Sequence, residues 1–364
     1  MAGTRPRRHG WTGAAKGVVQ MTPRDVPKVS VLMGAYNAER FLREALDDLL
    51  AQTMADFELV VVDDGSTDAT SSILEDYARR DGRIVLLRNG RNLGLPASLN
   101  RGLARCRADI VARADADDRY MPDRLARQLA FLEAHPEVGL MSCAVEKIDE
   151  QGRSLFVNRF PTKDGEIRMR ELFVNCFSHP GVMFRRRLVE EVGGYDETLL
   201  SSQDADLWQR LRRRTVAANL DAPLVRYRKH TAQNTADRSP EDREKSLAIR
   251  RRALEDYLAR EVPMKEAGAM VETFHCRNDR RADPDALQAG MRGLREVLAC
   301  ARRRESAETR RYFRTVVHDA LLGHARQQVS DPPLRRRLIA EAIRWRPARS
   351  ARRAGARLVP GIGV

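Results

Sequence analysis

The stretch Ala108-Asp109-Ile110-Val111-Ala112-Arg113-Ala114-Asp115-Ala116-Asp117-Asp118 joins a short apolar run to three closely spaced carboxylates. The apolar run predicts a buried strand, and ligands of open α/β sheets bind in the crevice at the carboxyl ends of the strands. Because like charges raise one another's pKa, gathering Asp115, Asp117 and Asp118 is costly unless a cation relieves the repulsion. Carboxylate oxygens favour Mg²⁺ or Mn²⁺, and Mg²⁺ is typically held by one or two carboxylates together with substrate phosphates. The stretch predicts a metal–diphosphate site; the alternative is a polar turn whose acids cap the next helix.

Similar strand-and-helix units precede this stretch. Apolar runs predict strands at 29–33, 57–62 and 84–87, with helically spaced apolar residues between them. The second of these strands also ends in acids, at Asp63 and Asp64. Such alternation predicts an α/β fold with a mostly parallel, twisted sheet flanked by helices, in which the carboxyl ends share one edge. A polar turn has no need to recur at the equivalent place, so the recurrence favours a binding site.

The pattern of strands and helices ends near His230, and the rest of the chain has helical spacing and abundant arginine. We therefore expect four segments: a disordered basic tail (1–27), a sheet-containing domain (28–236), an arginine-rich helical region (237–346) and a flexible tail (347–364).

Composition limits the classes of protein that fit. The 364 residues carry a formal net charge of +14, which predicts an anionic partner: nucleic acid, a nucleotide-bearing substrate or an anionic membrane surface. The five cysteines are odd in number and widely spaced, which favours reduced thiols in the cytoplasm over a disulfide framework or a zinc site. No apolar run approaches the roughly 18 residues that span a bilayer, and the first twenty residues lack the apolar core of a signal peptide.

Eight short motifs occur in order along the sheet-containing domain. They are Val29–Asn37, Asp63–Asp68, Asn92-x-Gly94, Asp115-x-Asp117-Asp118, Pro122–Leu125, His179–Met183, Gly193–Asp196 and Asp204–Trp208. Together they resemble the family 2 glycosyltransferases that have a single nucleotide-binding α/β domain of the A-type, Rossmann-like fold. The resemblance covers about 29–230, so 28–236 is expected to be the catalytic domain. It implies inverting, metal-dependent transfer of a single sugar from a nucleotide-diphospho-sugar, expected to be UDP-linked, to a hydroxyl acceptor in surface polysaccharide or glycolipid assembly.

The resemblance also implies which residues bind the donor. Asp64 is expected to accept hydrogen bonds from the uracil imide and the ribose, and Asp63 to support the turn. Gly94 permits close approach of the backbone to the base, although an ordinary helix start explains it equally well. The nucleotide-sugar site implied in this way comprises Ala35, Tyr36, Asn37, Asp63, Asp64, Gly94 and Asp115.

For the metal, Mn²⁺ or Mg²⁺, the resemblance implies Asp117 as the direct ligand, with Asp115 and the late histidine His230 beside it. The alternative for His230 is a surface residue at the edge of the domain. Arg113 is expected to pair with a neighbouring acid. His179 is expected to pack at the start of a strand, and the alternative is that it lines the acceptor cleft.

Asp204 matches the family's general base, which takes the proton of the acceptor hydroxyl as that oxygen attacks the anomeric carbon. The alternative is an acid favoured by the dipole at a helix N-terminus, and Asp206 is interpreted as a capping or supporting residue. The family usually has Glu before this acid, whereas this chain has Gln203.

The Gln-x-x-Arg-Trp motif and membrane spans of processive synthases are absent from the sequence, which favours transfer of one sugar per binding event. We expect a cytoplasmic protein whose acceptor is a hydroxyl group, with a lipid-linked saccharide as one candidate. For the arginine-rich helices two interpretations stay open: contact with the anionic inner face of the cell membrane, and a solvated helical face, which is the commoner meaning of such charge. Two alternatives remain open: a sugar nucleotidyltransferase, which would want a glycine-rich phosphate loop after the first strand, and a basic nucleic-acid-binding protein. Aromatic residues make up only 5% of the chain, so no nucleic-acid partner is expected.

Overall fold

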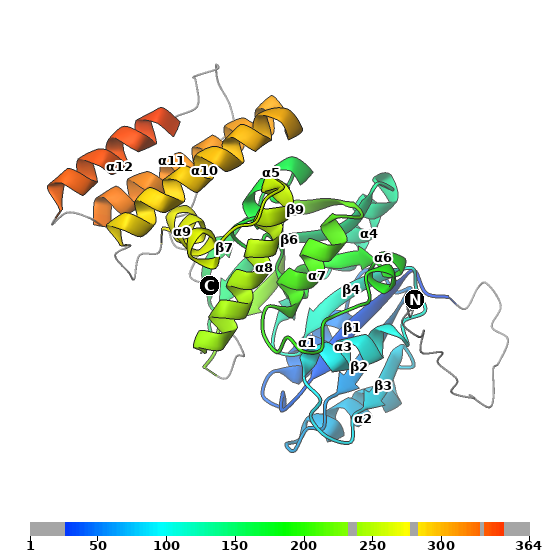
Figure 1. Ribbon diagram of the computed structural model, residues 1–364. Helices are drawn as coiled ribbons and strands as arrows, with labels where there is room; N and C mark the ends of the chain where they lie inside the picture. Colours follow the sequence, from blue (N-terminus) through cyan, green and yellow to red (C-terminus); the bar gives the residue numbers. More distant parts are fainter. Residues whose placement is uncertain (1–25, 232–238, 277–282, 328–330, 346–364) are drawn as a thin grey trace, which may run out of the picture.

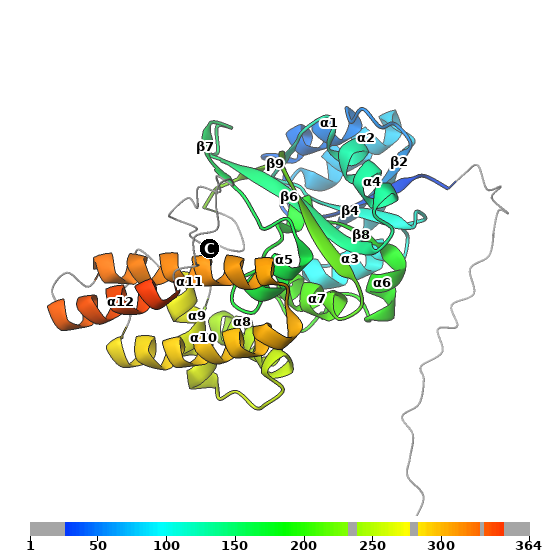
Figure 2. The ribbon, with the colours of Figure 1, turned by 90° about the horizontal axis from the view of Figure 1, so that it is seen from above.

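The computed structural model describes residues 26–231, 239–276, 283–327 and 331–345. A twisted sheet with helices on both faces forms one part of the molecule, and a group of helices from the second half of the chain lies beside it (Figures 1 and 2). The predicted tails lie outside the described residues apart from Val26 and Pro27, and the predicted boundary near Ala236 falls in the gap at 232–238.

The first half of the sheet is parallel, with strands in the order β3-β2-β1-β4. Nearly every side chain of β1, β2 and β4 is buried, as expected for parallel strands that helices cover on both faces. The strands are β1 (Val29–Ala35), β2 (Phe57–Asp63), β3 (Ile84–Arg88) and β4 (Ile110–Asp115), and the crossover helices are α1 (Leu42–Leu50), α2 (Thr70–Arg80) and α3 (Leu95–Leu103).

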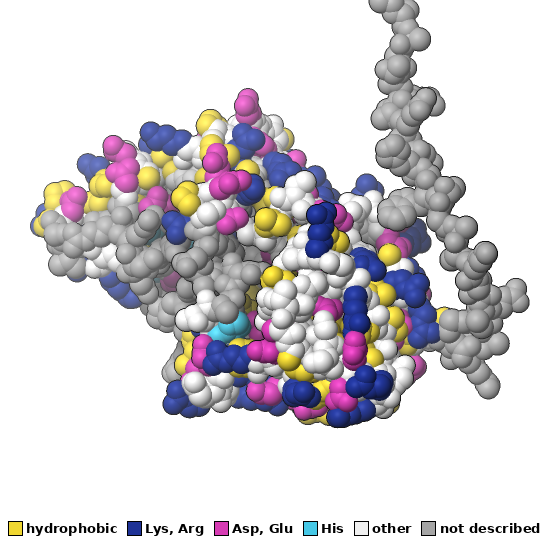
Figure 3. All heavy atoms as spheres, turned by 90° about the horizontal axis from the view of Figure 1, so that it is seen from below, with side chains coloured by type: hydrophobic (Ala, Val, Ile, Leu, Met, Phe, Trp, Pro, Cys, Tyr) yellow, Lys and Arg dark blue, Asp and Glu magenta, His cyan; other side chains and the backbone are white. Residues whose placement is uncertain are grey.

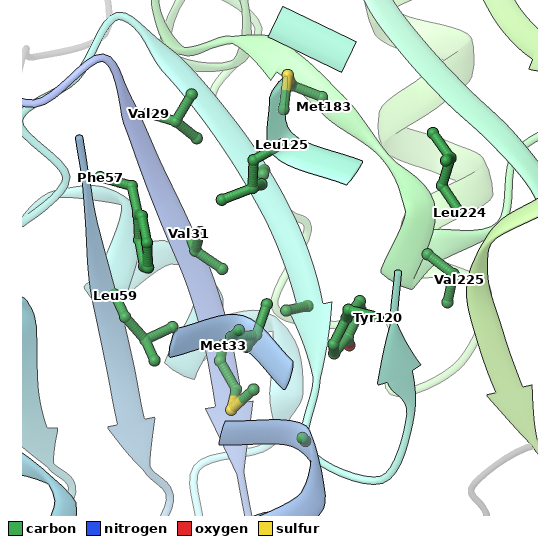
Figure 4. Close-up of a cluster of buried hydrophobic side chains, with 14 of the residues drawn as sticks. Val29, Val31, Met33, Phe57, Leu59, Tyr120, Leu125, Met183, Leu224 and Val225 are labelled. Carbon is green, nitrogen blue, oxygen red and sulfur yellow. The ribbon is translucent and has the colours of Figure 1, made fainter. Parts of the chain in front are cut away.

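Alternate side chains of β1 enter two different cores. Val29, Val31 and Met33 pack with α1 and α2 on one face, and Figure 4 shows them beside Phe57 and Leu59 of β2. Leu32 points to the other face, where it packs with Leu99 of α3. This period of two follows from the alternation of side chains along a strand.

The second half of the sheet makes it mixed. Beyond β4 the order continues β8-β6-β9-β5, with β4–β8, β8–β6 and β9–β5 antiparallel and β6–β9 parallel, while β7 pairs with β6. The strands are β5 (Arg119–Tyr120), β6 (Val138–Ile148), β7 (Ser154–Asn158), β8 (Met183–Arg185) and β9 (Val216–Arg228). The helices here are α4 (Arg124–Ala134), α5 (Asp164–Glu171), α6 (Arg186–Glu191), α7 (Gln203–Arg212) and a 3-10 turn at His179–Gly181.

The helices of the second half of the chain have an apolar core of their own. They are α8 (Pro240–Leu258), α9 (Met264–His275), α10 (Pro284–Arg304), α11 (Ala307–Gln327) and α12 (Pro332–Trp345). Their core includes Phe173, which follows α5 and stacks on Phe274 of α9 with ring centroids 4.4 Å apart. The helical part is therefore packed onto the sheet-containing part through α5. The expected fold, a twisted sheet flanked by helices and followed by a helical region, is confirmed.

Candidate active site

The ends of the parallel strands bring the predicted acids to one edge of the sheet. Ala35 at the end of β1 pairs with Asp63 at the end of β2, and Gly34 pairs with Asp115 at the end of β4. The three strands therefore end within one residue of one another, at one edge of the sheet, as the alternation of strands and helices predicts. The loops that follow them carry the other residues of the candidate site.

Asp63 and Asn37 hold the first two loops in place. Asp63 accepts a hydrogen bond from the Ser66 amide at 3.0 Å and another from the Ser71 hydroxyl, so its carboxylate supports the turn after β2. Asn37, at a φ of 47°, accepts through its side-chain oxygen from the Thr67 backbone amide at 2.9 Å. Its own backbone N–H donates to the Ser66 hydroxyl oxygen at 3.1 Å. These hydrogen bonds connect the two loops. Tyr36, which precedes Asn37 in the first loop, is 46% exposed and faces solvent.

Asp64 organises the loop that contains Gly94. Its buried carboxylate accepts from the amides of Leu93 and Gly94, both at 2.9 Å, and from the side-chain amide of Asn89 at 2.6 Å. A carboxylate has about four acceptor positions, so one remains for a ligand. Gly94 adopts φ 90° and ψ 154°, a conformation essentially restricted to glycine. The structure thus gives Gly94 a conformational role as well as a place beside Asp64.

The acids after β4 have three different environments. Asp115 accepts from the buried Arg113 guanidinium at 2.5 Å, which confirms the expected pairing of Arg113. Asp117 Oδ2 lies 2.9 Å from Nε2 of His230, a residue 113 positions away in the chain. Asp118 is fully buried, and its Oδ1 accepts from the Arg228 amide at 2.8 Å.

The remaining oxygen of Asp118, Oδ2, has no hydrogen-bond partner among the described residues. Burial, followed by the charges of Asp117 and Asp115, raises the pKa of Asp118 well above its ordinary value. The repulsion expected from three acids in four positions is therefore present in the structure, and a cation would relieve it.

The acids and His230 suit a divalent cation that phosphates help to hold. Within the described parts of the chain, no three His, Cys, Asp or Glu side chains converge as a complete ligand set. A cage of that kind is not needed for Mg²⁺, which is commonly held by one or two carboxylates while substrate phosphates complete its coordination. The pair Asp117–His230 with Asp115 nearby fits that mode.

Asp204 lies in the first turn of α7, where the helix dipole favours a negative charge. Its Oδ2 accepts from the side-chain amide of Asn175 at 2.8 Å, and Oδ1 has no partner among the described residues. Asp206 differs, because it is buried and paired with Arg210 at 2.7 Å within the same helix. The structure thus leaves Asp204, and not Asp206, with an available carboxylate oxygen.

His179 connects the base candidate with the acids after β4. Burial and the Arg113 charge lower the pKa of His179 to about 4, while the charges of Asp115 and Asp204 both oppose that shift. The segment around His179 also contacts both sides: Asn175 donates to Asp204 at 2.8 Å, and the Val182 carbonyl accepts from the backbone amide of Arg113, which pairs with Asp115. His179 itself bonds to the Tyr195 hydroxyl at 3.0 Å and packs on Trp208, as expected for a packing residue.

Three asparagines support the site without having been predicted from the sequence. Asn89 holds Asp64, Asn175 holds Asp204, and Asn100 binds both the amide and the carbonyl of Tyr195, at 2.8 and 2.9 Å. The sequence feature that could have identified Asn175 is its position as the single amide side chain in the apolar stretch Phe173–Phe177. Such a residue must find a hydrogen-bond partner when it is buried, but the sequence does not say which.

Comparisons with known proteins identify the family. The model of a family described as "Glycosyl transferase family 2" matches residues 30–193. The amylovoran biosynthesis glycosyltransferase AmsE of Erwinia amylovora is 36% identical over 187 residues, which cover 50% of this chain and 68% of AmsE. The Escherichia coli UDP-Gal:alpha-D-GlcNAc-diphosphoundecaprenol beta-1,3-galactosyltransferase is 32% identical over 215 residues, covering 57% of this chain and 78% of that protein.

Among solved structures, residues 1–349 of S. aureus TarS in complex with UDP-GlcNAc align with a TM-score of 0.56. The alignment covers 88% of this chain and 92% of the TarS chain at 20% sequence identity. At that identity the likeness is one of fold: a sheet-containing domain of the A-type followed by helices.

Proposed function

The chain belongs to the family 2 glycosyltransferases and is a glycosyl-transferring enzyme, and on that premise we propose that it transfers one sugar from a UDP-linked donor to a saccharide hydroxyl group with inversion. The observation that carries the proposal is that the segment 175–182 contacts both groups. Asn175 donates to Asp204, the base candidate, at 2.8 Å, and the Val182 carbonyl accepts at 2.9 Å from the backbone amide of Arg113, whose guanidinium binds Asp115. This connection supports the proposal that the donor-binding and proton-accepting groups belong to one site. Because the chain belongs to this family, we do not propose the two alternatives, a sugar nucleotidyltransferase and a nucleic-acid-binding protein.

In the proposed mechanism Asp204 is the general base. Its unoccupied Oδ1 accepts the proton of the acceptor hydroxyl, while Asn175 keeps Oδ2 in place. The acceptor oxygen forms the new bond to the anomeric carbon as the bond from that carbon to the diphosphate oxygen breaks on the opposite face. The configuration at the anomeric carbon is thereby inverted, and UDP leaves with the electron pair of the broken bond.

The other predicted residues bind the donor. Asp64, with one acceptor position left, receives the uracil N–H, and the loops containing Ala35, Tyr36, Asn37 and Gly94 enclose the nucleoside. Asp117, Asp115 and His230 would hold Mn²⁺ or Mg²⁺, which supplies positive charge to the departing diphosphate.

The relatives indicate the class of acceptor. The E. coli relative's name specifies a diphosphoundecaprenol-linked saccharide acceptor and a UDP-linked donor, and AmsE is named for polysaccharide biosynthesis. We extend both to this chain, as an enzyme of surface-polysaccharide or O-antigen assembly that works on a lipid-linked saccharide at the cytoplasmic face of the membrane. In the described part of the chain, no helix has the length and apolarity needed to cross a bilayer.

The test is a panel of UDP- and GDP-linked sugars with Mn²⁺ or Mg²⁺, in which release of nucleoside diphosphate is measured. Asp117→Ala and Asp204→Asn should each reduce release to background, and EDTA should do the same to the unsubstituted enzyme. Asp109→Asn, a carboxylate that is 98% exposed at the opposite end of β4, is the matched control and should leave turnover unchanged. Turnover that survives in Asp204→Asn would assign the base to another residue.

A further inference from the structure

Helix α12 buries one side and exposes the other. Its buried residues lie at helical spacing against α11 and the core of the helical part: Leu334, Leu338, Ala342 and Trp345. In Figure 1, α12 forms the outer edge of this group of helices, beside α11. The side turned away from α11 has no partner element among the described residues. We define the α12 outer face as Arg335, Arg336, Arg337, Ile339, Ala340, Ile343 and Arg344, all of them exposed.

The exposed charge on this helix is of a single sign. The only acid in α12 is Glu341, which is 4% exposed and is bound to Arg295 at 2.6 Å, to Arg344 at 3.1 Å and to the Trp345 indole N–H at 3.1 Å. Arg344 is thus paired with a buried acid, whereas Arg335, Arg336 and Arg337 have no acid of α12 beside them. Figure 3 shows acidic side chains among the basic ones over both the sheet-containing part and the helical part. After Trp345 the sequence continues with five more arginines and no Asp or Glu.

Two large apolar side chains lie among these arginines. Ile343 is 63% exposed and Ile339 is 37% exposed, one helical turn apart. Exposed isoleucines on a positive surface are unfavourable in water and become favourable where headgroup charge and acyl chain meet. Each arginine close to an anionic bilayer also contributes attraction that salt screens.

We propose that the α12 outer face binds the surface of an anionic phospholipid bilayer, with its arginines at the headgroups and Ile343 inserted at the headgroup boundary. A second copy of the chain is a poorer occupant, because like-charged arginines would meet across the interface. Nucleic acid is poorer as well, because Ile339 and Ile343 would face phosphates. The inference is independent of the proposed function, since binding is measured without donor or acceptor.

The experiment is flotation of the full chain with phosphatidylcholine vesicles, with and without about one third phosphatidylglycerol, in about 0.1 M and about 0.5 M salt. The chain should float only with the anionic vesicles, and less at high salt. Removing two surface arginines, Arg335→Gln with Arg336→Gln, should lower the partition constant about 30-fold. Ile343→Ser should lower the fraction that remains bound in high salt.

The matched control removes two exposed arginines of the sheet-containing part, Arg105→Gln with Arg187→Gln, and should float like the unsubstituted chain. An equal loss in this control would overturn the proposal, because total charge and not the α12 outer face would then decide binding. Two other results would also overturn it: binding to duplex DNA without binding to vesicles, and a dimer that Ile343→Ser dissociates. Sugar transfer to a soluble acceptor should be unchanged in the α12 variants, which separates this test from that of the proposed function.

Discussion

The conformation of Gly94 leads to a quantitative prediction. At φ 90° and ψ 154° an alanine is strained by roughly 1–3 kcal/mol. The added Cβ would lie 3.4 Å from Leu200 Cδ2 and 3.9 Å from Pro96 Cδ, which are ordinary contacts, so the backbone and not crowding determines the cost. Gly94→Ala should therefore lower the free energy of unfolding by about 1–3 kcal/mol.

Donor binding should weaken for a related reason. Relaxation of the strained backbone would move the Gly94 amide away from Asp64 Oδ2, which it contacts at 2.9 Å. A hydrogen bond to a charged group contributes about 1.5–3 kcal/mol. Relief of the strain would therefore weaken this hydrogen bond and displace the Asp64 carboxylate. Since about 1.4 kcal/mol corresponds to tenfold in affinity, we expect the Kd of UDP to rise about tenfold or more.

The assays are urea unfolding and calorimetric titration with UDP. Gly152→Ala is the control, because Gly152 also has a positive φ, of 79°, lies in the turn between β6 and β7, and has open space where its Cβ would be placed. It should lose stability without losing affinity for UDP. Unchanged stability and affinity in Gly94→Ala, or equal weakening of UDP binding in Gly152→Ala, would refute the reasoning.

The remaining predictions concern the pH dependence of stability and the three supporting asparagines. Burial raises the pKa of Glu171 to about 7, so the folded state holds the proton more tightly than the unfolded state. The resulting contribution to the free energy of unfolding is present below pH 4.5 and is lost as the pH rises towards 7. His179, lowered to a pKa of about 4, contributes above pH 6.5 and loses that contribution as pH falls. Between pH 4.5 and 6.5 the effects of Glu171 and His179 on stability oppose each other. In Glu171→Gln only the effect of His179 remains, so the free energy of unfolding should fall by about 1.4 kcal/mol per pH unit of acidification, whereas in His179→Gln it should rise. A flat pH profile for Glu171→Gln in urea melts would contradict this. Asn175→Ala should lower kcat about 10- to 100-fold while the KM for the donor stays within about twofold, because it removes the bond that holds Asp204; a change in donor KM alone would place Asn175 in the donor site instead. Asn100→Ala should cost about 1–2 kcal/mol of stability, since it releases both backbone groups of Tyr195, and an unchanged melting curve would show that water replaces both bonds.

Local pattern was sufficient for the parallel half of the sheet. The runs of β1, β2 and β4 are almost wholly apolar and end in Ala35, Asp63 and Asp115, so both the strands and their common edge could be predicted. Strand β9 was not predicted over most of its length. Its side chains are unevenly buried and its register with β6 shifts three times, so it lacks the period of two that identifies a strand in a sequence.

By itself, the sequence determined the α/β class, the membership of the family and the acids at the ends of β2 and β4, because each depends on residues close together in the chain. Only the tertiary structure decided that His230 contacts Asp117, that Asn175 holds Asp204 and that Asp64 is bound by the Gly94 loop. It also decided which side of α12 is left for a partner. The physical reason is that these contacts join residues far apart in the chain. Packing of strands and helices, and not local periodicity, determines which of them meet.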